Sequence, residues 1–211
     1  MAAPSMPDAG VNAKSQPTKQ RLIDAGMRLL LKHGYNGLGI QAVLAEVGVP
    51  KGSFYHHFSD KEEFALQVLD TYMDAVHQGL DASLGDTSRA PLARIRFFFE
   101  NTRDAYDQEG FLGCLIGGLG QELSGVNDVF RQKIDACFAA LAERLAGSLE
   151  EARQEGAIAR DSNPRDLANL LVDCWEGAAL RSRLRRDPKP LIAMVDFYLG
   201  ALADTAQTEI R

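Results

Sequence analysis

A cluster of side chains suited to binding nucleic acid lies in one short segment of this sequence. The segment contains Lys51, Gly52, Ser53, Tyr55, His56 and His57. Lysine binds phosphate, while hydroxyl and imidazole groups form hydrogen bonds with phosphates and base edges. A glycine lets the backbone approach a duplex closely. The segment is therefore expected to contact double-stranded DNA; the alternative is an ordinary solvated surface.

The neighbouring histidines also raise the question of a metal site. Adjacent residues of a helix point about 100° apart, so His56 and His57 would not face one ion together. No carboxylate or cysteine stands near them at the spacing of a ligand set. We expect no metal and no cofactor.

The cysteines bear on the compartment. Cys114, Cys137 and Cys174 are widely spaced and form no Cys-x-x-Cys pair, so neither a disulfide framework nor a zinc site is expected. This usage fits a reducing cytoplasm. For Cys137 and Cys174, each on an apolar helical stripe, packing in a core is the favoured interpretation.

Apolar residues recur at helical spacing along almost the whole chain, which predicts an all-α fold. Gly48 and Pro50 predict a tight turn between two short helices, as in a helix-turn-helix. Ser59 to Glu63 offer two overlapping capping boxes for the long helix that follows, with its stripe from Phe64 to Leu80. The eight other predicted helices span residues 18–33, 40–47, 51–57, 88–107, 112–123, 126–155, 164–183 and 188–206.

Composition and charge suggest how the chain is organised. Residues 1–60 hold six basic and four acidic residues, a net charge of +2 within a chain of net charge −6. A phosphate-binding surface is therefore expected near the N-terminus. The longest apolar run, residues 111–120, is about half of what a bilayer span requires. We predict a flexible arm at 1–16, a helix-turn-helix domain at 17–62 and a larger domain at 63–211.

The order and spacing of Gly34-Tyr35, of residues 40–49, of residues 50–58 and of Asp60-Lys61-Glu62 closely resemble the DNA-binding domain of the TetR family. The resemblance implies that Tyr55 and Lys61 bind phosphate and that the recognition helix reads bases. The start of Lys61's helix also favours an anion. Leu38 and Gly39 replace the usual hydroxyl residues, and Gln41, which can pair with adenine, replaces a common basic residue. The operator sequence is therefore not inferable.

The resemblance further implies a body that binds a small effector and dimerises through its last two helices, with two recognition helices about one DNA turn apart. The candidate interface residues are Leu167, Leu170, Leu171, Ala178, Ala179, Leu191, Val195, Tyr198 and Leu202. Packing within one protomer is the alternative for each of them.

Residues 111–117 with Gln121-Glu122, and later residues 174–178, resemble the branch with electrophile-responsive NemR and acrylate-responsive AcuR regulators. This implies a reactive Cys114 near a helix N-terminus, which favours the thiolate that attacks activated alkenes or aldehydes. Burial as a small apolar residue is the alternative for Cys114, and plain core packing for Trp175. The other candidate effector-binding residues are Tyr106, Phe111, Trp175, Glu176, Arg181 and Arg183, of which either Arg181 or Arg183 would meet a carboxylate.

These observations lead to one functional hypothesis and two alternatives. The hypothesis is a cytoplasmic repressor, not an enzyme, that binds a palindromic operator as a homodimer and is released by a small effector. A detoxifying enzyme with Cys114 as nucleophile would need a base. Because His56 and His57 belong to the predicted DNA-binding segment, only His33 and His77 remain as candidate bases. A helical interaction adaptor would bind no DNA. The sequence does not fix the effector, the regulated genes or the direction of the response.

Overall fold

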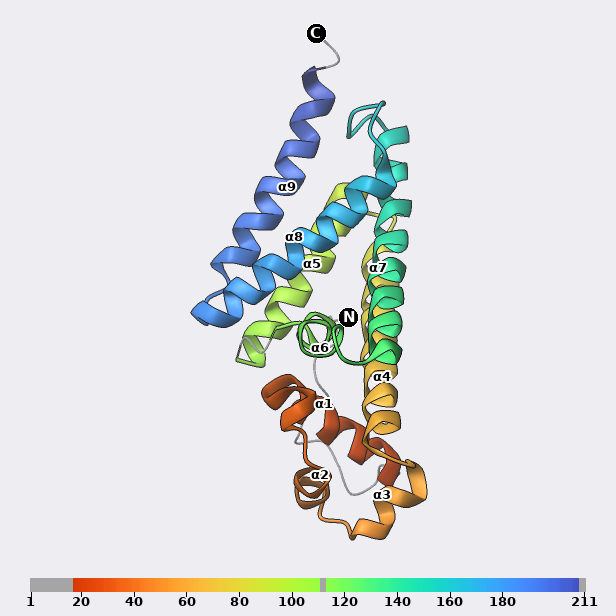
Figure 1. The fold of residues 1–211 in the computed structure, drawn as a ribbon. Helices are drawn as coiled ribbons and strands as arrows, with labels where there is room; N and C mark the ends of the chain where they lie inside the picture. The colour runs from red at the N-terminus through yellow and green to blue at the C-terminus, as the bar shows by residue number, and fades with distance from the viewer. Residues whose placement is uncertain (1–16, 111–112, 209–211) are drawn as a thin grey trace. The chain divides into compact units, whose positions relative to one another are not determined.

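The structure, a computed structural model, describes residues 17–110 and 113–208. Within these ranges the chain is all-α, with nine helices and no strand (Figure 1). No helix in the described part is long and apolar enough to cross a membrane. The helices are α1 (Thr18–Gly37), α2 (Ile40–Val47), α3 (Lys51–His57), α4 (Lys61–Leu84), α5 (Pro91–Gln108), α6 (Leu115–Leu123), α7 (Asp128–Gln154), α8 (Pro164–Arg185) and α9 (Lys189–Thr208).

The described chain forms two compact units. One, here called the head unit, consists of residues 17–75 and 114–134, and the other, the body unit, of residues 76–110, 113 and 135–208. The long helices α4 and α7 each contribute residues to both units. The head unit is larger than the predicted domain at 17–62, because α6 packs against α1.

Aromatic packing holds the head unit together. Phe54 of α3 is fully buried, and its ring lies 5.2 Å from that of Phe58 and 5.1 Å from that of Phe64 on α4. The first pair of rings is tilted and the second is edge-on, and such contacts add to the free energy gained by burying large rings. Because α3 has only seven residues, it depends on this packing rather than on its own helical propensity.

Turns and caps place the short helices as the sequence predicts. Gly48 adopts a left-handed conformation with φ of +72° and ends α2, and Pro50 precedes α3. Asp60 accepts a hydrogen bond from the backbone of Glu63, whose side chain accepts one from the backbone of Ser59. The bond from the Glu63 N–H to Asp60 is the one that the predicted capping box contains, whereas the Glu63 carboxylate binds the N–H of Ser59 in place of that of Asp60. Together the two bonds fix the first turn of α4.

The predicted start of α6 at residue 112 is wrong. Leu112 lies outside the described residues, and Gly113 has a φ of +82°, which does not belong to a right-handed helix. The helix begins at Leu115, with Cys114 as its N-cap residue. Cys114 is therefore placed directly at the helix start.

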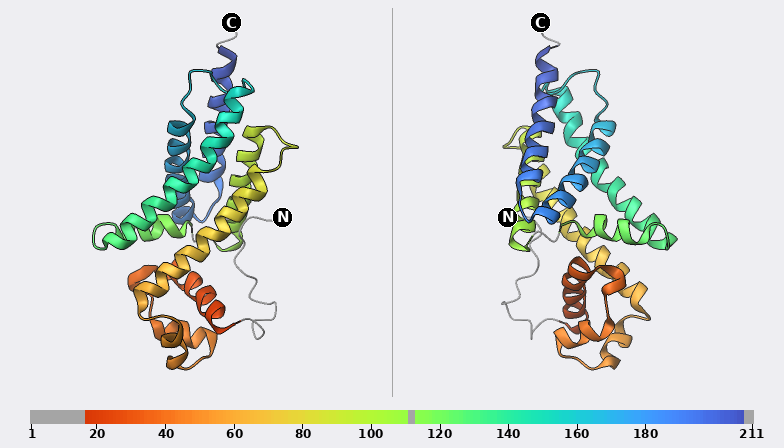
Figure 2. Two further views of the ribbon diagram at one scale, coloured as in Figure 1. Left: turned by 90° about the vertical axis from the view of Figure 1, so that its right-hand side faces the viewer. Right: turned by 60° about the vertical axis from the view of Figure 1, so that its left-hand side comes forward.

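The body unit is built on α8 and α9, which lie side by side in every view, and α5 packs against α9 (Figure 2). Arg94 of α5 is 5% exposed, yet its guanidinium donates hydrogen bonds to the carbonyl of Leu84 and to Glu151 of α7. A buried charge requires such partners. This arginine ties α5 to α7 and to the end of α4.

Replacing the buried anchor of α3 tests the packing of the head unit. We expect Phe54→Ala to lower the free energy of unfolding by about 3–5 kcal/mol, because it removes a fully buried ring and leaves a cavity. Urea unfolding followed by circular dichroism measures this change. The control is Tyr55→Phe, which removes only the hydroxyl of a 48% exposed side chain and should change the stability by under about 0.5 kcal/mol. Equal effects of the two substitutions would contradict the anchoring role of Phe54.

Candidate functional site

The outer face of α3 carries the side chains that the sequence predicts to contact DNA. Lys51, Gly52, Tyr55 and His56 are exposed, and Ser53 and His57 are partly exposed. The Lys51 ammonium lies 5.6 Å from the centroid of the Tyr55 ring, and no atom lies within 4 Å of where a Cβ on Gly52 would stand. With Phe54 facing inward, α3 presents an open, polar and cationic face.

Two arginines of α1 brace the helices that present this face. The Arg21 guanidinium donates a 2.5 Å hydrogen bond to the carbonyl of Val47 at the end of α2, and Arg28 forms a 2.7 Å ion pair with Glu46. Gln41, on the first turn of α2, is exposed. It is therefore free of the core, and its predicted contact with a base stays a prediction.

Lys61 is the first residue of α4, where the free N–H groups of the helix start favour an anion. Its ammonium lies 4.5 Å from the centroid of the Tyr35 ring, a cation–π geometry. Hydrogen bonds from Ser59 lower the pKa of Glu63 in the same turn. The first turn of α4 thus carries both a lysine and an ionised carboxylate.

Sequence reasoning missed the role of one acidic residue in the head unit, Glu122 of α6. Its two carboxylate oxygens accept hydrogen bonds from the backbone N–H groups of Tyr35 (2.7 Å) and Asn36 (2.6 Å). The Tyr35 ring also contacts that of Phe130, with centroids 5.2 Å apart. Burial raises the pKa of Tyr35, and the nearby carboxylates of Glu62 and Asp60 add to this effect. No local pattern signals a contact between residues so far apart in the sequence.

Cys114 lies in the head unit as the N-cap residue of α6 and is partly exposed. The hydroxyl of Tyr72 on α4 donates a hydrogen bond to its sulfur at 3.8 Å. The sulfur thus lies at a helix start and beside a hydroxyl donor. The arrangement suits a nucleophilic cysteine, although its reactivity stays a prediction.

Two of the predicted effector-binding residues meet in the body unit. The rings of Tyr106 and Trp175 have centroids 6.0 Å apart, and Phe99 packs on Trp175 at 4.6 Å. The side chain of Arg183 passes close to Gly113: a Cβ on Gly113 would stand 3.6 Å from the Cδ atom of Arg183. Phe111 lies outside the described residues, Arg181 is exposed and Glu176 is partly exposed.

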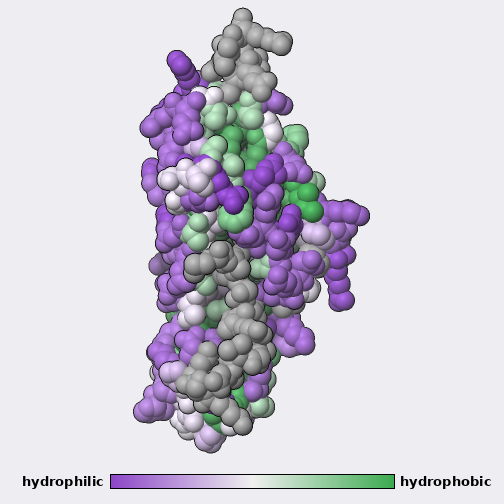
Figure 3. Space-filling model, turned by 180° about the vertical axis from the view of Figure 1, so that it is seen from behind, coloured by the Kyte–Doolittle hydropathy of each residue, from purple (hydrophilic) through white to green (hydrophobic). Residues whose placement is uncertain are grey.

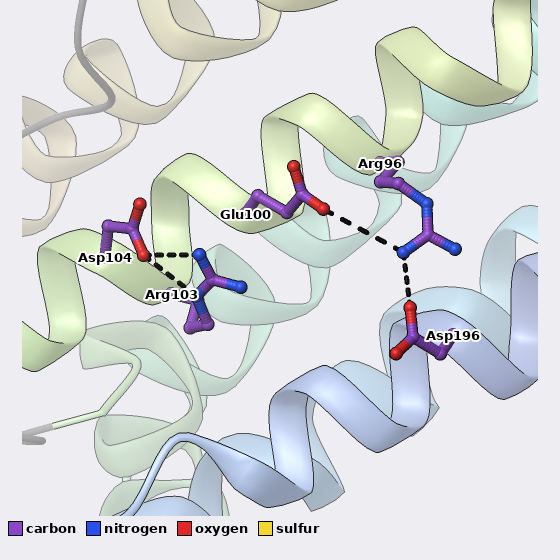
Figure 4. A network of polar contacts seen from close by, with 5 residues as sticks. All are labelled: Arg96, Glu100, Arg103, Asp104 and Asp196. Atoms are coloured by element: carbon purple, nitrogen blue, oxygen red, sulfur yellow. Dashed lines mark hydrogen bonds and ion pairs between the residues drawn. The ribbon is translucent and has the colours of Figure 1, made fainter.

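A shallow hollow with room for about 20 Å³ opens beside Trp175, between α5 and α9. Arg96 and Asp196 form a 2.5 Å ion pair at this hollow, and Arg103 binds Asp104 (Figure 4). This volume is far below that of an ordinary ligand pocket, about 300–1,000 Å³, and the arginines of the hollow already have carboxylate partners. It therefore lacks the free cation that a carboxylate ligand needs.

Most predicted interface residues pack inside a single protomer. Leu170 is exposed and Leu167 partly exposed, whereas the other seven are buried in this one chain. Tyr198 shows the reason, since its hydroxyl donates a 2.6 Å hydrogen bond to the carbonyl of Leu167 across the packing of α8 on α9. Burial, with a smaller contribution from Cys174, raises the pKa of Tyr198 to about 12. The buried residues are Leu171, Ala178, Ala179, Leu191, Val195, Tyr198 and Leu202.

The outward faces of α8 and α9 are apolar in places that the sequence did not single out. The exposed fraction is 69% for Leu184 and 79% for Phe197. Green apolar patches lie among polar ones near the C-terminal end in the space-filling view (Figure 3). The other large exposed apolar residues of these helices are Leu170, Leu180 and Ile192.

The described residues bring no three histidine, cysteine, aspartate or glutamate side chains together as a metal site. The rings of His56 and His57 stand 4.8 Å apart at the end of α3, with no third ligand in the described part.

Two short helices, α2 and α3, are joined by a tight turn, and the second has a polar outer face. This arrangement defines a helix-turn-helix transcription regulator. Residues 22–68 match the family described as bacterial regulatory proteins of the tetR family. Residues 91–197 match the tetracyclin repressor-like C-terminal domain. The chain belongs to the TetR family.

The relatives include proteins of the branch that the sequence resembles. The chain is 33% identical to the transcriptional repressor DhaR of Mycobacterium sp. (strain GP1), over 90% of this chain and 95% of DhaR. It is 38% identical to the transcriptional regulator AcuR of Cereibacter sphaeroides, over 82% and 79%. The crystal structure of reduced Escherichia coli NemR superposes with a TM-score of 0.78 at 30% identity, covering 86% and 94%.

Family membership decides between the hypotheses that the sequence left open. Members of the TetR family are transcription regulators and not enzymes, so the detoxifying enzyme is set aside. These regulators bind DNA and small-molecule effectors, typically as dimers. A helical adaptor that binds no DNA does not fit the family.

Proposed function

We propose that this protein is a dimeric repressor that binds a palindromic DNA operator and releases it when a small electrophile or unsaturated carboxylate reacts near Cys114. The observation that carries the proposal is the outer face of α3, whose polar residues point outward while Phe54 is fully buried. A helix held in this way fits the major groove.

The proposed DNA contacts fall into two kinds. Lys51, Tyr55 and Lys61 contact phosphates and set the register, which carries no sequence information by itself. Gln41, Ser53 and the histidines of α3 reach base edges, with Gly52 leaving room for the duplex. Lys51 and Lys61 stand at the starts of α3 and α4. The N-terminus of each helix therefore adds to the attraction that its lysine exerts on a phosphate.

The proposed dimer forms through the exposed apolar stripes of α8 and α9. Leu170, Leu180 and Leu184 lie at spacings that return to one side of α8, and Phe197 is the most exposed large apolar side chain of α9. A two-fold axis brings the same patch of two subunits together. This assignment replaces the buried members of the predicted interface, which already pack within one protomer.

The effector step is a covalent addition to the Cys114 thiolate. Its sulfur forms a bond to the β-carbon of an activated alkene, and the carbanion formed takes a proton from water, so the adduct gains the full mass of the alkene. The N-cap position of Cys114 and the Tyr72 hydroxyl at 3.8 Å support the required thiolate.

The DNA-binding proposal is tested by fluorescence anisotropy with a duplex from upstream of the protein's own gene. We expect a Kd of about 10⁻⁸ M or lower, at least about 10³-fold tighter than for an unrelated duplex. Lys51→Gln should weaken both complexes and reduce the salt slope by about 1, since one phosphate contact is lost. The control is Lys189→Gln, which removes an exposed lysine of the body unit. Equal affinity for both duplexes would refute the repressor.

The dimer proposal is tested by sedimentation equilibrium. We expect Phe197→Asp to weaken self-association by about 100-fold, because it places a charge at the centre of an apolar contact on both subunits. Val129→Asp is the matched control, since Val129 is 52% exposed but belongs to α7 in the head unit. A wild-type protein that is monomeric at micromolar concentration, or a Phe197→Asp variant that still dimerises fully, would rule out this interface.

The effector proposal is tested with acrylate-like and small aldehyde compounds on the preformed DNA complex. We expect these compounds to release the wild-type protein and to leave Cys114→Ser bound, because a serine hydroxyl does not add to the alkene. Cys174→Ser is the control, since Cys174 is also free and partly exposed. Mass spectrometry should find the alkene adduct on Cys114. An unchanged response of Cys114→Ser would remove the covalent sensing step.

A further inference from the structure

The end of α1 presents two backbone N–H groups that match the two oxygens of the Glu122 carboxylate. Its two acceptor oxygens take one N–H each, from the consecutive residues Tyr35 and Asn36. Two N–H groups that point the same way form a small anion-binding concavity, and charge-assisted hydrogen bonds are the strong kind. The contact joins residues 87 and 86 positions apart.

Gly34 makes this concavity possible. Its φ of +69° and ψ of −179° interrupt α1, so the last turn of the helix starts anew at Tyr35 with free N–H groups. A Cβ at position 34 would also stand 2.5 Å from a carboxylate oxygen of Glu122. Both the backbone conformation and the approach of the acid therefore require glycine at this position.

Tyr35 connects this contact to the start of α4. Its backbone is held by Glu122, one side of its ring packs on Phe130, and the ammonium of Lys61 lies 4.5 Å from the ring centroid. Next to Lys61, the Glu62 carboxylate accepts a 2.7 Å hydrogen bond from Asn127. Lys61 is thus positioned through Tyr35 by Glu122 of α6, and Glu62 is positioned directly by Asn127, which lies between α6 and α7.

We propose that Glu122 is a positioning residue for DNA binding: it fixes Tyr35, and the Tyr35 ring holds the Lys61 ammonium where α4 meets the phosphate backbone. The proposal rests on the proposed function and adds to it a residue on α6, the helix that begins after Cys114. A lysine side chain loses rotamer freedom when it binds, and one already held over a ring has less freedom left to lose.

The direction of the effect separates positioning from simple charge. An acid near bound DNA repels phosphate, so neutralising it would strengthen binding if charge were its only influence. A positioning role predicts the opposite. Glu122→Gln keeps the size of the side chain but replaces one acceptor oxygen with an NH₂ group, which cannot accept from the second N–H.

The experiment measures anisotropy of a random-sequence duplex of about 30 base pairs between 50 and 200 mM salt, because phosphate contacts do not depend on sequence. We expect Glu122→Gln to bind about 5- to 10-fold more weakly, with a salt slope lowered by about 1, as for Lys61→Gln. The double variant should be no weaker than Lys61→Gln alone, since both changes remove the same contact. Glu143→Gln is the control; it neutralises an exposed, ion-paired glutamate in the body unit.

A second pair of variants keeps the test decisive if Glu122→Gln folds poorly. Tyr35→Phe retains the ring and should bind DNA like wild type. Tyr35→Leu removes the ring and should lower the salt slope of DNA binding as Glu122→Gln does. Absence of salt-dependent DNA binding by the wild-type protein would refute the proposed function itself. Normal binding by wild type with equal or tighter binding by Glu122→Gln, or additive losses in the double variant, would overturn the role of Glu122 alone.

Discussion

The burial of Phe54 is the interaction on which the rest of the head unit depends. A seven-residue helix has too few internal hydrogen bonds to persist by itself. The ring of Phe54, packed against Phe58 and Phe64, fixes both the position of α3 and its rotation about its own axis. Because one side of so short a helix must face inward, its polar residues are turned outward together. The same contact thus supplies stability and directs the proposed DNA-reading surface.

Local sequence rules were sufficient for the turn before α3 and the first turn of α4. Gly48, Pro50 and the residues from Ser59 to Glu63 act through turns and caps, whose signals lie within a few positions of one another. The all-α fold followed equally from helical periodicity, and the structure confirms it in the described ranges. The late start of α6 was missed because apolar residues continue through a segment whose backbone, at Gly113, is not helical.

Long-range contacts and the choice of partner were beyond the sequence. Nothing local links Glu122 to Tyr35, since their pairing depends on how α6 packs on α1. An apolar stripe marks the buried side of a helix, but it does not say whether a neighbouring helix of the same chain or a second copy buries it. Leu191 and Val195 therefore read as interface residues, although α9 turns them into its own protomer. The exposed Phe197 lies outside that stripe.

The composition of α6 has a mechanical consequence. Three of its nine residues are glycines, at positions 117, 118 and 120, and each makes a helix about 1 kcal/mol less favourable than alanine would. The helix is therefore maintained by the burial of Leu115, Ile116, Leu119 and Leu123 rather than by its own backbone preference. A soft segment of this kind yields before its stiffer neighbours when its packing is disturbed. This easily disturbed helix lies between the Cys114 thiol, at its start, and the Glu122 carboxylate, near its end.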